Sequence, residues 1–449
     1  MDNTIKRIAA YAQAFNFAML DEDAVHQCKR RIIDTLGCAL GAYSAEPCRV
    51  ARDLALRVRD ESGATIFGTG HRTLPEFAAF ANGVMARYLD GNDTFPGGGG
   101  HPSDLISPVV AVAEATGANG KSTIAAIALA YEVYLAFFRG ARMRDHGMDH
   151  VLYTAAGSAI GAAKLLGLDL PKLEHTVALA VTPNLALHAT RRGDLSMWKG
   201  CAAANAARNG VFAALLAAGG MTGPDGAIDG SHGLRELVGK FELGELPQKS
   251  GWAITRSNIK YFLAEYHSQA PITLALGLSR ELTPADIESV TIYTYWFAWS
   301  EIGSEPEKWH PATRESADHS LPFIIAAVLI DRGFSDEIFS QERLRDPAVY
   351  ALADRIAVKE DPAFTKRFPD EIPCRIEIRT RAGEVKTASV DYPRGHVKNP
   401  LSDEEVTAKF KSLAGRLLSP KETEIALEKV WNLDKAKNLH GLLEALSTH

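Results

Sequence analysis

Two segments rich in alanine and glycine constrain the fold of this chain most. Residues 150–168 read HVLYTAAGSAIGAAKLLGL, and residues 200–220 read GCAAANAARNGVFAALLAAGG. Apolar residues recur in both at helical spacing, and small residues on several faces let neighbouring helices approach closely. The sequence therefore predicts that two closely packed helices form the centre of a helical domain.

The helical pattern extends nearly everywhere up to about residue 265. It predicts one helix over residues 24–43 that closes at a glycine, and a buried helix over the apolar run 123–138. That run contains Glu132 and is too short to span a bilayer. Between these segments, ATGANGKS at 115–122 resembles a loose phosphate-binding loop, but the residues before it are helix-like. We therefore expect a turn between two helices there.

The pattern changes to strand-like alternation after about residue 265. Strands are expected over 289–298, 354–361, 374–380 and 385–393, with a turn at 381–384 and a helix starting between His319 and Pro322. Helical periodicity then returns near the C-terminus. The sequence thus predicts a mainly α fold, in which an all-α domain of residues 1–265 and 405–449 carries an inserted α+β lid domain of residues 266–404.

Composition excludes several classes of partner and cofactor. The net charge is −6 in 449 residues, and no block of Lys or Arg offers a surface for nucleic acid. The five cysteines are far apart and form no CxxC pair, which argues against a disulfide framework, structural zinc or an iron–sulfur cluster. The N-terminus lacks the features of a secretory signal. We expect a cytoplasmic protein with no membrane partner.

The loop YLDGNDTFPGGGGHPSD, residues 88–104, is the leading candidate for a functional site. It gathers Asp90, Asp93, Asp104, Thr94 and His101 around four consecutive glycines. Asp and Asn also cap helices, and glycines also simply permit turns. Alternatively, the glycines let backbone N–H groups approach a ligand on which a carboxylate, a hydroxyl and an imidazole converge.

Three further segments carry cations and imidazoles near the ends of expected helices. ARMRDHGMDH at 141–150 contains Arg142, Arg144, His146 and His150, SMWKG contains Lys199, and SNIKYFLAEYHSQ contains Lys260, Tyr261 and His267. Each residue alone is more typical of a structural role. Together they suggest a cleft that binds a small anion.

With these segments in order, the chain resembles the MmgE/PrpD family over most of its length. The matching segments are YLDGNDTFPGGGGHPSD, AAGSAIGAAKLLGLDL, NGVFAALLAAGGMTGP, KYFLAEYHSQ, ESADHSLPFIIAAVLIDRG and YPRGHVKNPLSDEEVTAKF. The family includes 2-methylcitrate dehydratases, cis-aconitate decarboxylases and iminodisuccinate epimerases. The resemblance implies a helical domain holding both chain ends, an inserted lid, a homodimer, and catalysis without a metal or other cofactor.

Carried over by position, the catalytic residues of the family fall on Asp90, Thr94, His101, His150, Lys199 and Lys260. We expect the substrate to contact Gly99, Gly100, Arg142, Tyr261 and His267 as well. This chain has Phe323 where the family commonly has a tyrosine, and Tyr261 could supply the missing phenol.

The resemblance implies acid–base chemistry on a small di- or tricarboxylate. We expect dehydration of 2-methylcitrate to 2-methylaconitate, with decarboxylation, epimerisation or binding without catalysis as alternatives. In this hypothesis His101 is a general base or acid oriented by Asp90, and His150 handles the leaving hydroxyl. Lys199 and Lys260 bind carboxylates, Thr94 donates a hydrogen bond, and residues 97–100 present backbone N–H groups.

Overall fold

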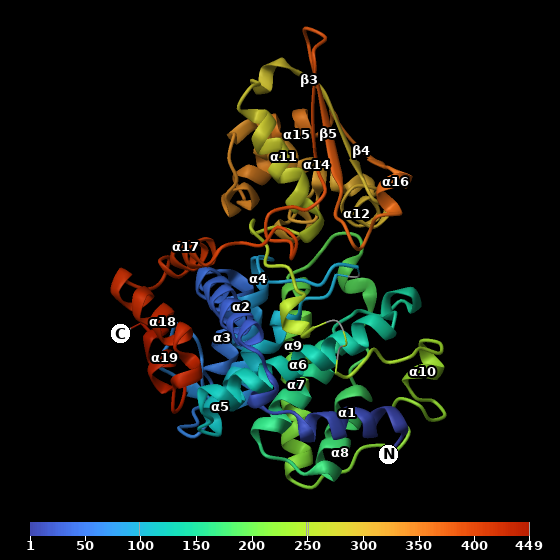
Figure 1. Ribbon diagram of the computed structural model, residues 1–449. Helices are drawn as coiled ribbons and strands as arrows, with labels where there is room; N and C mark the ends of the chain where they lie inside the picture. Colours follow the sequence, from blue (N-terminus) through green and yellow to red (C-terminus); the bar gives the residue numbers. More distant parts are fainter. Residues whose placement is uncertain (98, 248, 250, 449) are drawn as a thin grey trace. The chain divides into compact units, whose positions relative to one another are not determined.

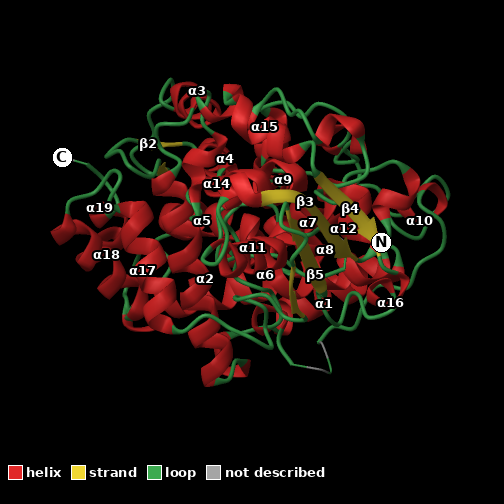
Figure 2. Cartoon of the chain, turned by 90° about the horizontal axis from the view of Figure 1, so that it is seen from above, coloured by secondary structure: helices red, strands yellow, loops and turns green. Residues whose placement is uncertain are grey.

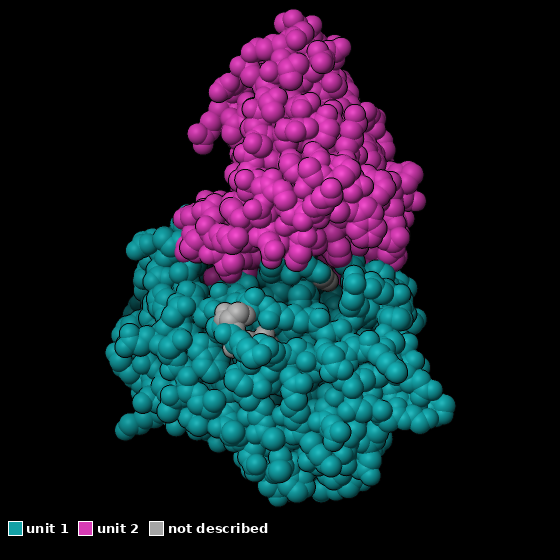
Figure 3. All heavy atoms as spheres, turned by 45° about the vertical axis from the view of Figure 1, so that its right-hand side comes forward, with its two compact units in different colours: residues 1–190, 200–257, 402–449 teal, residues 191–199, 258–401 magenta. Residues whose placement is uncertain are grey.

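The computed structural model describes residues 1–97, 99–247, 249 and 251–448. The chain divides into two compact units (Figure 3): unit 1 consists of Met1–Thr190, Gly200–Ser257 and Ser402–His449, and unit 2 of Arg191–Lys199 and Asn258–Leu401. Helices dominate the described residues (Figure 2), which confirms the mainly α fold expected from the sequence.

Unit 1 is helical apart from one short ribbon of two antiparallel strands, β1 (Ala64–Thr65) and β2 (Arg72–Thr73). This ribbon is the small departure from an all-α domain. The helices before unit 2 are α1 (Asn3–Ala14), α2 (Glu22–Gly41), α3 (Glu46–Ala55), α4 (Pro75–Tyr88), α5 (Ile106–Ala115), α6 (Gly120–Gly140), α7 (Leu152–Leu165), α8 (Leu170–Val181), α9 (Trp198–Ala218) and α10 (Leu234–Leu237). The C-terminal ones are α17 (Asp403–Ala414), α18 (Pro420–Trp431) and α19 (His440–Ala445).

The small residues of α7 and α9 allow the close packing that the sequence predicts. A Cβ atom added at Gly210 of α9 would lie 2.5 Å from the Ala155 carbonyl oxygen of α7. One added at Gly157 of α7 would lie 3.0 Å from the Ala130 carbonyl oxygen of α6. Helix backbones therefore meet almost directly at these points, and α7 lies against α6 along much of its length.

Helix α6 forms the buried core of unit 1. The Asn119 side chain accepts a hydrogen bond from the Ser122 N–H (2.9 Å) and caps its start, which confirms a turn between two helices in place of a phosphate-binding loop. The helix runs from Gly120 to Gly140 and is long and apolar enough to cross a membrane by composition, but 83% of its apolar window is buried inside the structure. Burial of this kind is typical of a core helix.

The C-terminal segment packs back on the N-terminal helices, because α17 lies along α2. A capping box starts α17: Ser402 Oγ accepts the Glu405 N–H, and the Glu405 carboxylate accepts the Ser402 N–H. Both ends of the chain thereby belong to the same unit.

Unit 2 is built on a four-stranded sheet with the strand order β4-β3-β5-β6. Strands β3 (Ile287–Thr294) and β4 (Ile356–Glu360) are parallel, whereas β5 (Cys374–Thr380) is antiparallel to both β3 and β6 (Val385–Val390). The helices of unit 2 are α11 (Gln269–Ser279), α12 (Trp296–Ile302), α13 (Arg314–Ala317), α14 (Leu321–Asp331), α15 (Pro347–Ala353) and α16 (Pro362–Thr365).

Helices α11 and α14 lie together on the sheet (Figure 1), where α11 contacts β5 and β6 and α14 contacts β4. The strand expected over residues 289–298 is too long at its end, since β3 stops at Thr294 and α12 begins at Trp296. A helical turn there buries Ala298 and Ile302 on one face, and this packing outweighs the strand preference of the neighbouring aromatic residues.

Unit 2 also contains residues 191–199, which we call the strap and which our expected boundaries placed in the all-α domain. The last two residues of the strap begin α9, and the rest of that helix belongs to unit 1. The Leu195 N–H donates to Ser316 Oγ (3.0 Å), and Thr313 Oγ1 donates to the Leu195 carbonyl (3.1 Å). The main boundaries of the unit fall at Asn258 and Leu401, compared with residues 266 and 404 in our expectation. The strap joins unit 2 because its hydrogen bonds go to α13 and the residue before it.

Candidate active site

The glycine-rich loop of unit 1 connects α4 to α5 and closes on itself. The Phe95 N–H donates to the Gly100 carbonyl (2.9 Å), and the Thr94 hydroxyl donates to the same oxygen (2.9 Å). Gly97 and Gly99 have φ angles of 104° and 74°, a region that favours glycine. Gly98 lies outside the described residues, so the turn is defined by its neighbours.

A buried carboxylate that we did not assign to the site holds this loop in place. Asp93 is fully buried, and its side chain accepts hydrogen bonds from the Ser103 N–H (2.8 Å) and the Tyr131 hydroxyl (3.0 Å). The guanidinium of Arg31 lies 3.9 Å from the same carboxylate. Asp93 thus joins the two sides of the loop to α6 and α2.

A lysine from the far end of the sequence also reaches the loop. Lys409 of α17 donates from Nζ to the Gly91 carbonyl (2.7 Å) and lies 2.7 Å from the Asp34 carboxylate of α2. Burial raises the pKa of Asp34. Burial is the largest single influence on the pKa of Lys409 and lowers it, but the charges of Asp34, Cys38 and Asp93 and the hydrogen bond to Asp34 together outweigh burial, and the net direction is upward. The two groups form an ion pair, because opposite charges at this distance stabilise each other.

His101 leaves the loop just before η2 (Pro102–Leu105) and is 6% exposed. Its Nδ1 atom lies 2.9 Å from the Asp93 carbonyl oxygen. Because a carbonyl can only accept, Nδ1 carries the hydrogen, and Nε2 is the basic nitrogen of the neutral ring. The Asp93 backbone therefore orients this imidazole. Asp90 pairs with Arg87 instead, 2.6 Å away, and its expected action on His101 stays a prediction.

His150 lies just before α7 and is also 6% exposed. Its Nδ1 atom is 2.8 Å from the carboxylate of Asp149, which in turn accepts the His150 N–H (2.7 Å). The rings of His101 and His150 lie 6.2 Å apart between centroids. Unit 1 therefore brings two imidazoles together, one held by a backbone carbonyl and the other by a carboxylate.

Three other residues assigned to unit 1 have different surroundings. Thr94 uses its hydroxyl hydrogen within the loop, so its expected bond to substrate stays a prediction. A Cβ atom added at Gly100 would lie 2.7 Å from the Tyr134 hydroxyl, so glycine is needed there for packing. The Arg142 side chain is 79% exposed and pairs with Asp145 (3.0 Å).

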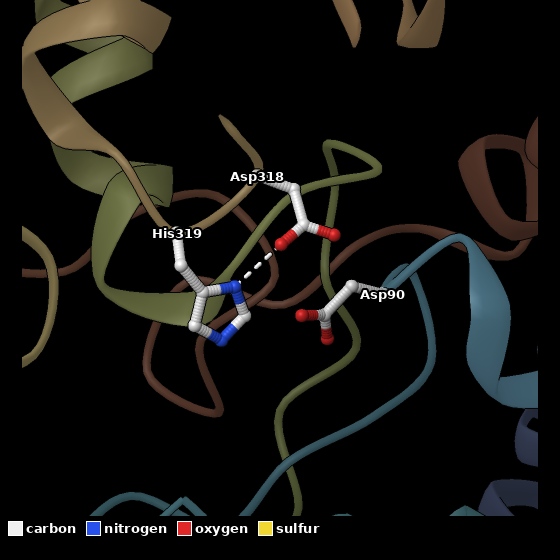
Figure 4. Close-up of side chains that lie close together, drawn as sticks. All are labelled: Asp90, Asp318 and His319. Carbon is white, nitrogen blue, oxygen red and sulfur yellow. Dashed lines mark hydrogen bonds and ion pairs between the residues drawn. The ribbon is translucent and has the colours of Figure 1, made fainter. Parts of the chain in front are cut away.

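In unit 2, Lys199 at the end of the strap is held by a carboxylate that sequence reasoning missed. Lys199 Nζ donates to both oxygens of Asp318, at 2.8 and 2.9 Å, and both side chains are buried. His319 Nδ1 contacts the same carboxylate (Figure 4), and Arg314 lies 3.4 Å from it. One buried acid thus fixes two cations and an imidazole. The segment ESADHSLPF already marked this region, but not the partner of Lys199.

Asp318 and His319 are residue types that also bind metal ions, yet the ammonium of Lys199 already spans both carboxylate oxygens. A metal ion at Asp318 would have to displace this ammonium. The arrangement within unit 2 is therefore that of an ion-pair cluster, and catalysis without a cofactor stays a prediction.

Lys260 is 1% exposed and follows a backbone segment that a distant loop fixes. The Val397 N–H donates to Asn258 Oδ1 (2.8 Å), and Gly395 has a φ of 93°. A Cβ atom at Gly395 would lie 1.9 Å from the Ile259 carbonyl oxygen. Only glycine fits at this close approach, which sets the position of the segment that carries Lys260.

The remaining residues assigned to unit 2 divide between the surface and the core. Tyr261 is 45% exposed. His267 is buried among aromatic rings, where its Nδ1 contacts the Tyr295 hydroxyl and its Nε2 lies 3.7 Å from the Glu265 carboxylate. Phe323 of α14 belongs to the hydrophobic core of unit 2. Contact of Tyr261 and His267 with substrate stays a prediction.

Paired imidazoles and fixed ammonium groups are side chains that acid–base catalysis on anions can use. The family model for the MmgE/PrpD N-terminal domain matches residues 6–242, and that for the C-terminal domain matches residues 262–433. The chain therefore belongs to the MmgE/PrpD family.

Relatives with assigned names align over nearly the whole chain. A 2-methylcitrate dehydratase of Salmonella typhimurium is 28% identical, covering 92% of this chain and 90% of its own length, and that of Escherichia coli K12 is 28% identical with the same coverage. A cis-aconitate decarboxylase of Homo sapiens is 26% identical, covering 95% of this chain and 91% of its own length. Both named activities are lyase reactions, and these relatives support a lyase activity for the chain.

Proposed function

We propose that this chain dehydrates 2-methylcitrate to 2-methylaconitate without a metal or other cofactor. The observation that carries the proposal is the pair of imidazoles of His101 and His150, with ring centroids 6.2 Å apart and Nδ1 atoms held by different partners. Relatives named 2-methylcitrate dehydratase cover 92% of the chain and support this choice of substrate.

The two environments suit opposite roles in an elimination. A carbonyl partner keeps hydrogen on Nδ1 of His101, so Nε2 is the basic nitrogen that would remove a proton from the carbon beside a substrate carboxylate. A carboxylate partner favours the imidazolium form of His150, which can protonate the departing hydroxyl. The C–H electron pair becomes the new double bond, and the hydroxyl leaves as water.

Charge that develops on the substrate carboxylate needs fixed cations. We propose this role for Lys199 and Lys260, both of which are buried in unit 2. A homodimer and a cytoplasmic location belong to the same proposal. The small anionic carboxylate is the partner we expect.

Decarboxylation of cis-aconitate is the second candidate, and the human decarboxylase relative favours it. It begins from the same anionic substrate class but breaks a carbon–carbon bond and releases carbon dioxide. Epimerisation, in which a proton leaves and returns on the other face, needs only the two imidazoles. The product distinguishes these reactions: water and an alkene, carbon dioxide, or inverted stereochemistry alone.

The test uses purified full-length protein treated with EDTA. It is incubated with 2-methylcitrate, citrate and cis-aconitate, while alkene absorbance, proton NMR and carbon dioxide release are followed. Alkene from 2-methylcitrate is the expected result. Carbon dioxide from cis-aconitate alone would replace the dehydratase proposal with the decarboxylase. Stabilisation of the thermal melt by these anions without any product would mark a binding protein.

A further inference from the structure

We propose that the imidazole of His396 in unit 2 donates a hydrogen bond from Nε2 to a carboxylate oxygen of the substrate. This inference rests on the proposed function, because it names a further residue that recognises the anionic substrate. His396 lies in the segment YPRGHVKNP, residues 392–400. The segment contributed to the family resemblance, but none of its residues entered our candidate site.

The backbone of Lys398 fixes which ring nitrogen of His396 carries the hydrogen. Nδ1 lies 3.1 Å from the Lys398 backbone nitrogen, and because a backbone N–H can only donate, Nδ1 is the acceptor. The hydrogen of the neutral ring is therefore on Nε2. Burial and, less strongly, the Lys398 charge lower the pKa of His396 from 6.5 to about 4, so the ring is neutral near pH 7. His396 thus presents one N–H donor at Nε2.

This donor is buried and has no acceptor within the described part of the chain. His396 is 2% exposed, and its Nε2 atom forms no hydrogen bond to any residue that the structure describes. The ring packs against Tyr392, with centroids 5.0 Å apart, and this contact leaves Nε2 without a polar partner. Buried polar groups in native proteins are nearly always hydrogen-bonded, and exceptions frequently have a functional reason. An acceptor oxygen from a ligand would complete the hydrogen bonding of this ring.

The backbone on both sides of His396 approaches residues 258–261, the segment that carries Lys260. On one side, a Cβ atom added at Gly395 would lie 1.9 Å from a carbonyl oxygen of this segment. On the other side, the Val397 N–H donates to the side chain of the first residue of the segment (2.8 Å). His396 and Lys260 therefore come from two stretches of backbone that are fixed against each other. In our proposal, both bind carboxylates of the same substrate.

A neutral donor suits the chemistry that we propose. The substrate carboxylate beside the reacting carbon gains negative charge during the elimination, and a buried N–H group stabilises such charge more strongly than one in water. A neutral imidazole keeps its hydrogen, whereas an imidazolium would compete with the catalytic acid by protonating the anion. The positive charge of Lys398 also acts on the ring of His396, and this charge favours an anion beside it.

The test compares His396→Asn with the matched control His396→Gln, because the side-chain amide of Asn reaches the place of Nδ1 and that of Gln the place of Nε2. His396→Asn keeps an acceptor for the Lys398 N–H but loses the donor. Its affinity for tricarballylate, an unreactive tricarboxylate, should fall about 10- to 100-fold in calorimetry, and kcat/KM for the substrate should fall at least as far. His396→Gln keeps the donor, and its affinity should stay within about threefold of that of the original protein. A purely structural role of Nδ1 gives the opposite order.

Binding of tricarballylate requires no turnover, and it therefore separates this inference from the proposed function. If the protein binds tricarballylate but converts none of the substrates, the proposed reaction fails, and the order of the two variants still tests the inference. Unchanged affinity in folded His396→Asn, an equal or larger loss in His396→Gln, or no binding of tricarballylate by the original protein would overturn it.

If His396→Asn does not fold, NMR of the original protein with ¹⁵N-labelled histidine decides. The relevant signal belongs to a histidine that stays neutral at pH 5 and carries its hydrogen on Nε2. Tricarballylate should move the Nε2 proton of this histidine to lower field, as a new hydrogen bond does. If no neutral histidine responds in this way, the inference is wrong.

Discussion

His101 in unit 1 and Lys199 in unit 2 are held by different means. In unit 1, His101 is oriented by a backbone carbonyl, and buried Asp93 and distant Lys409 support the loop that carries it. In unit 2, Lys199 is tied directly to the buried carboxylate of Asp318. A carbonyl partner leaves an imidazole able to gain and lose a proton, whereas an ion pair fixes a charge. In the function we propose, His101 would therefore transfer a proton and Lys199 would supply constant positive charge.

The largest effect should come from removing the imidazole to which we assign proton transfer. We expect His101→Ala to lower kcat about 10³-fold, because removal of a general acid or base typically has an effect of this size. The thermal melt should stay near that of the original protein. The control His146→Ala removes an exposed imidazole and should leave kcat unchanged. Substantial activity in His101→Ala would contradict the role.

Removal of the carboxylate that holds Lys199 should lower the stability of the protein. Asp318→Asn leaves two cations at a buried site without their shared carboxylate, and this should lower the free energy of unfolding by about 3 kcal/mol in urea titrations. The matched control is Asp354→Asn in the same unit, where the pair with His310 is more than half exposed on both sides. It should cost no more than about 0.5 kcal/mol. Equal losses of unfolding free energy in both variants would contradict a special role for the buried carboxylate of Asp318.

The stability of the protein should also depend on pH through a buried histidine of unit 2. His396 accepts the Lys398 N–H at Nδ1 (3.1 Å), and burial, helped by the Lys398 charge, lowers its pKa from 6.5 to about 4. Since the folded pKa lies below the unfolded one, its contribution to stability is present above about pH 6.5 and is lost as the pH falls toward 4.

Between pH 7 and pH 5 this group should cost about 2 kcal/mol of unfolding free energy. Urea midpoints of the original protein and of His396→Gln, measured at both pH values, provide the check. The variant should lose less stability on acidification. The same dependence of stability on pH in both proteins would show that groups other than His396 cause it.

The smallest effect concerns the closure of the glycine loop. Thr94→Val removes the hydroxyl that donates to the Gly100 carbonyl, which should lower kcat/KM about fivefold and the free energy of unfolding by about 1 kcal/mol. Thr94→Ser should restore both. If Thr94→Val keeps its stability but loses far more in kcat/KM, the hydroxyl acts on the substrate, as the sequence led us to expect.

The main features of the fold were predictable because small residues and alternating patterns report local structure. The Ala- and Gly-rich helices and the turn between α5 and α6 are confirmed by the structure. The end of β3 was not predictable, since the packing of α12 overrides the preference of aromatic residues for strands. The strap was also unpredictable, because its place in unit 2 depends on a few hydrogen bonds to α13 and the residue before it.

Site residues inside one motif could be proposed from the sequence, but their partners could not. Asp318, 119 positions after Lys199, and Lys409, 318 positions after Gly91, meet those residues only in the folded chain. Arg142, which we expected to contact substrate, is exposed and pairs with Asp145, whereas Arg144 is partly buried. Local patterns identify the groups that carry chemistry, whereas tertiary contacts decide which group orients which.

The strap has a consequence for dividing this chain into fragments. Residues 258–401 form a continuous stretch, but a gene fragment coding for them alone would lack residues 191–199. Asp318 would then lose Lys199, and Ser316 would lose the Leu195 backbone that bonds to it. A fragment that keeps these contacts would have to include the strap, either fused through a short linker or added as a separate peptide.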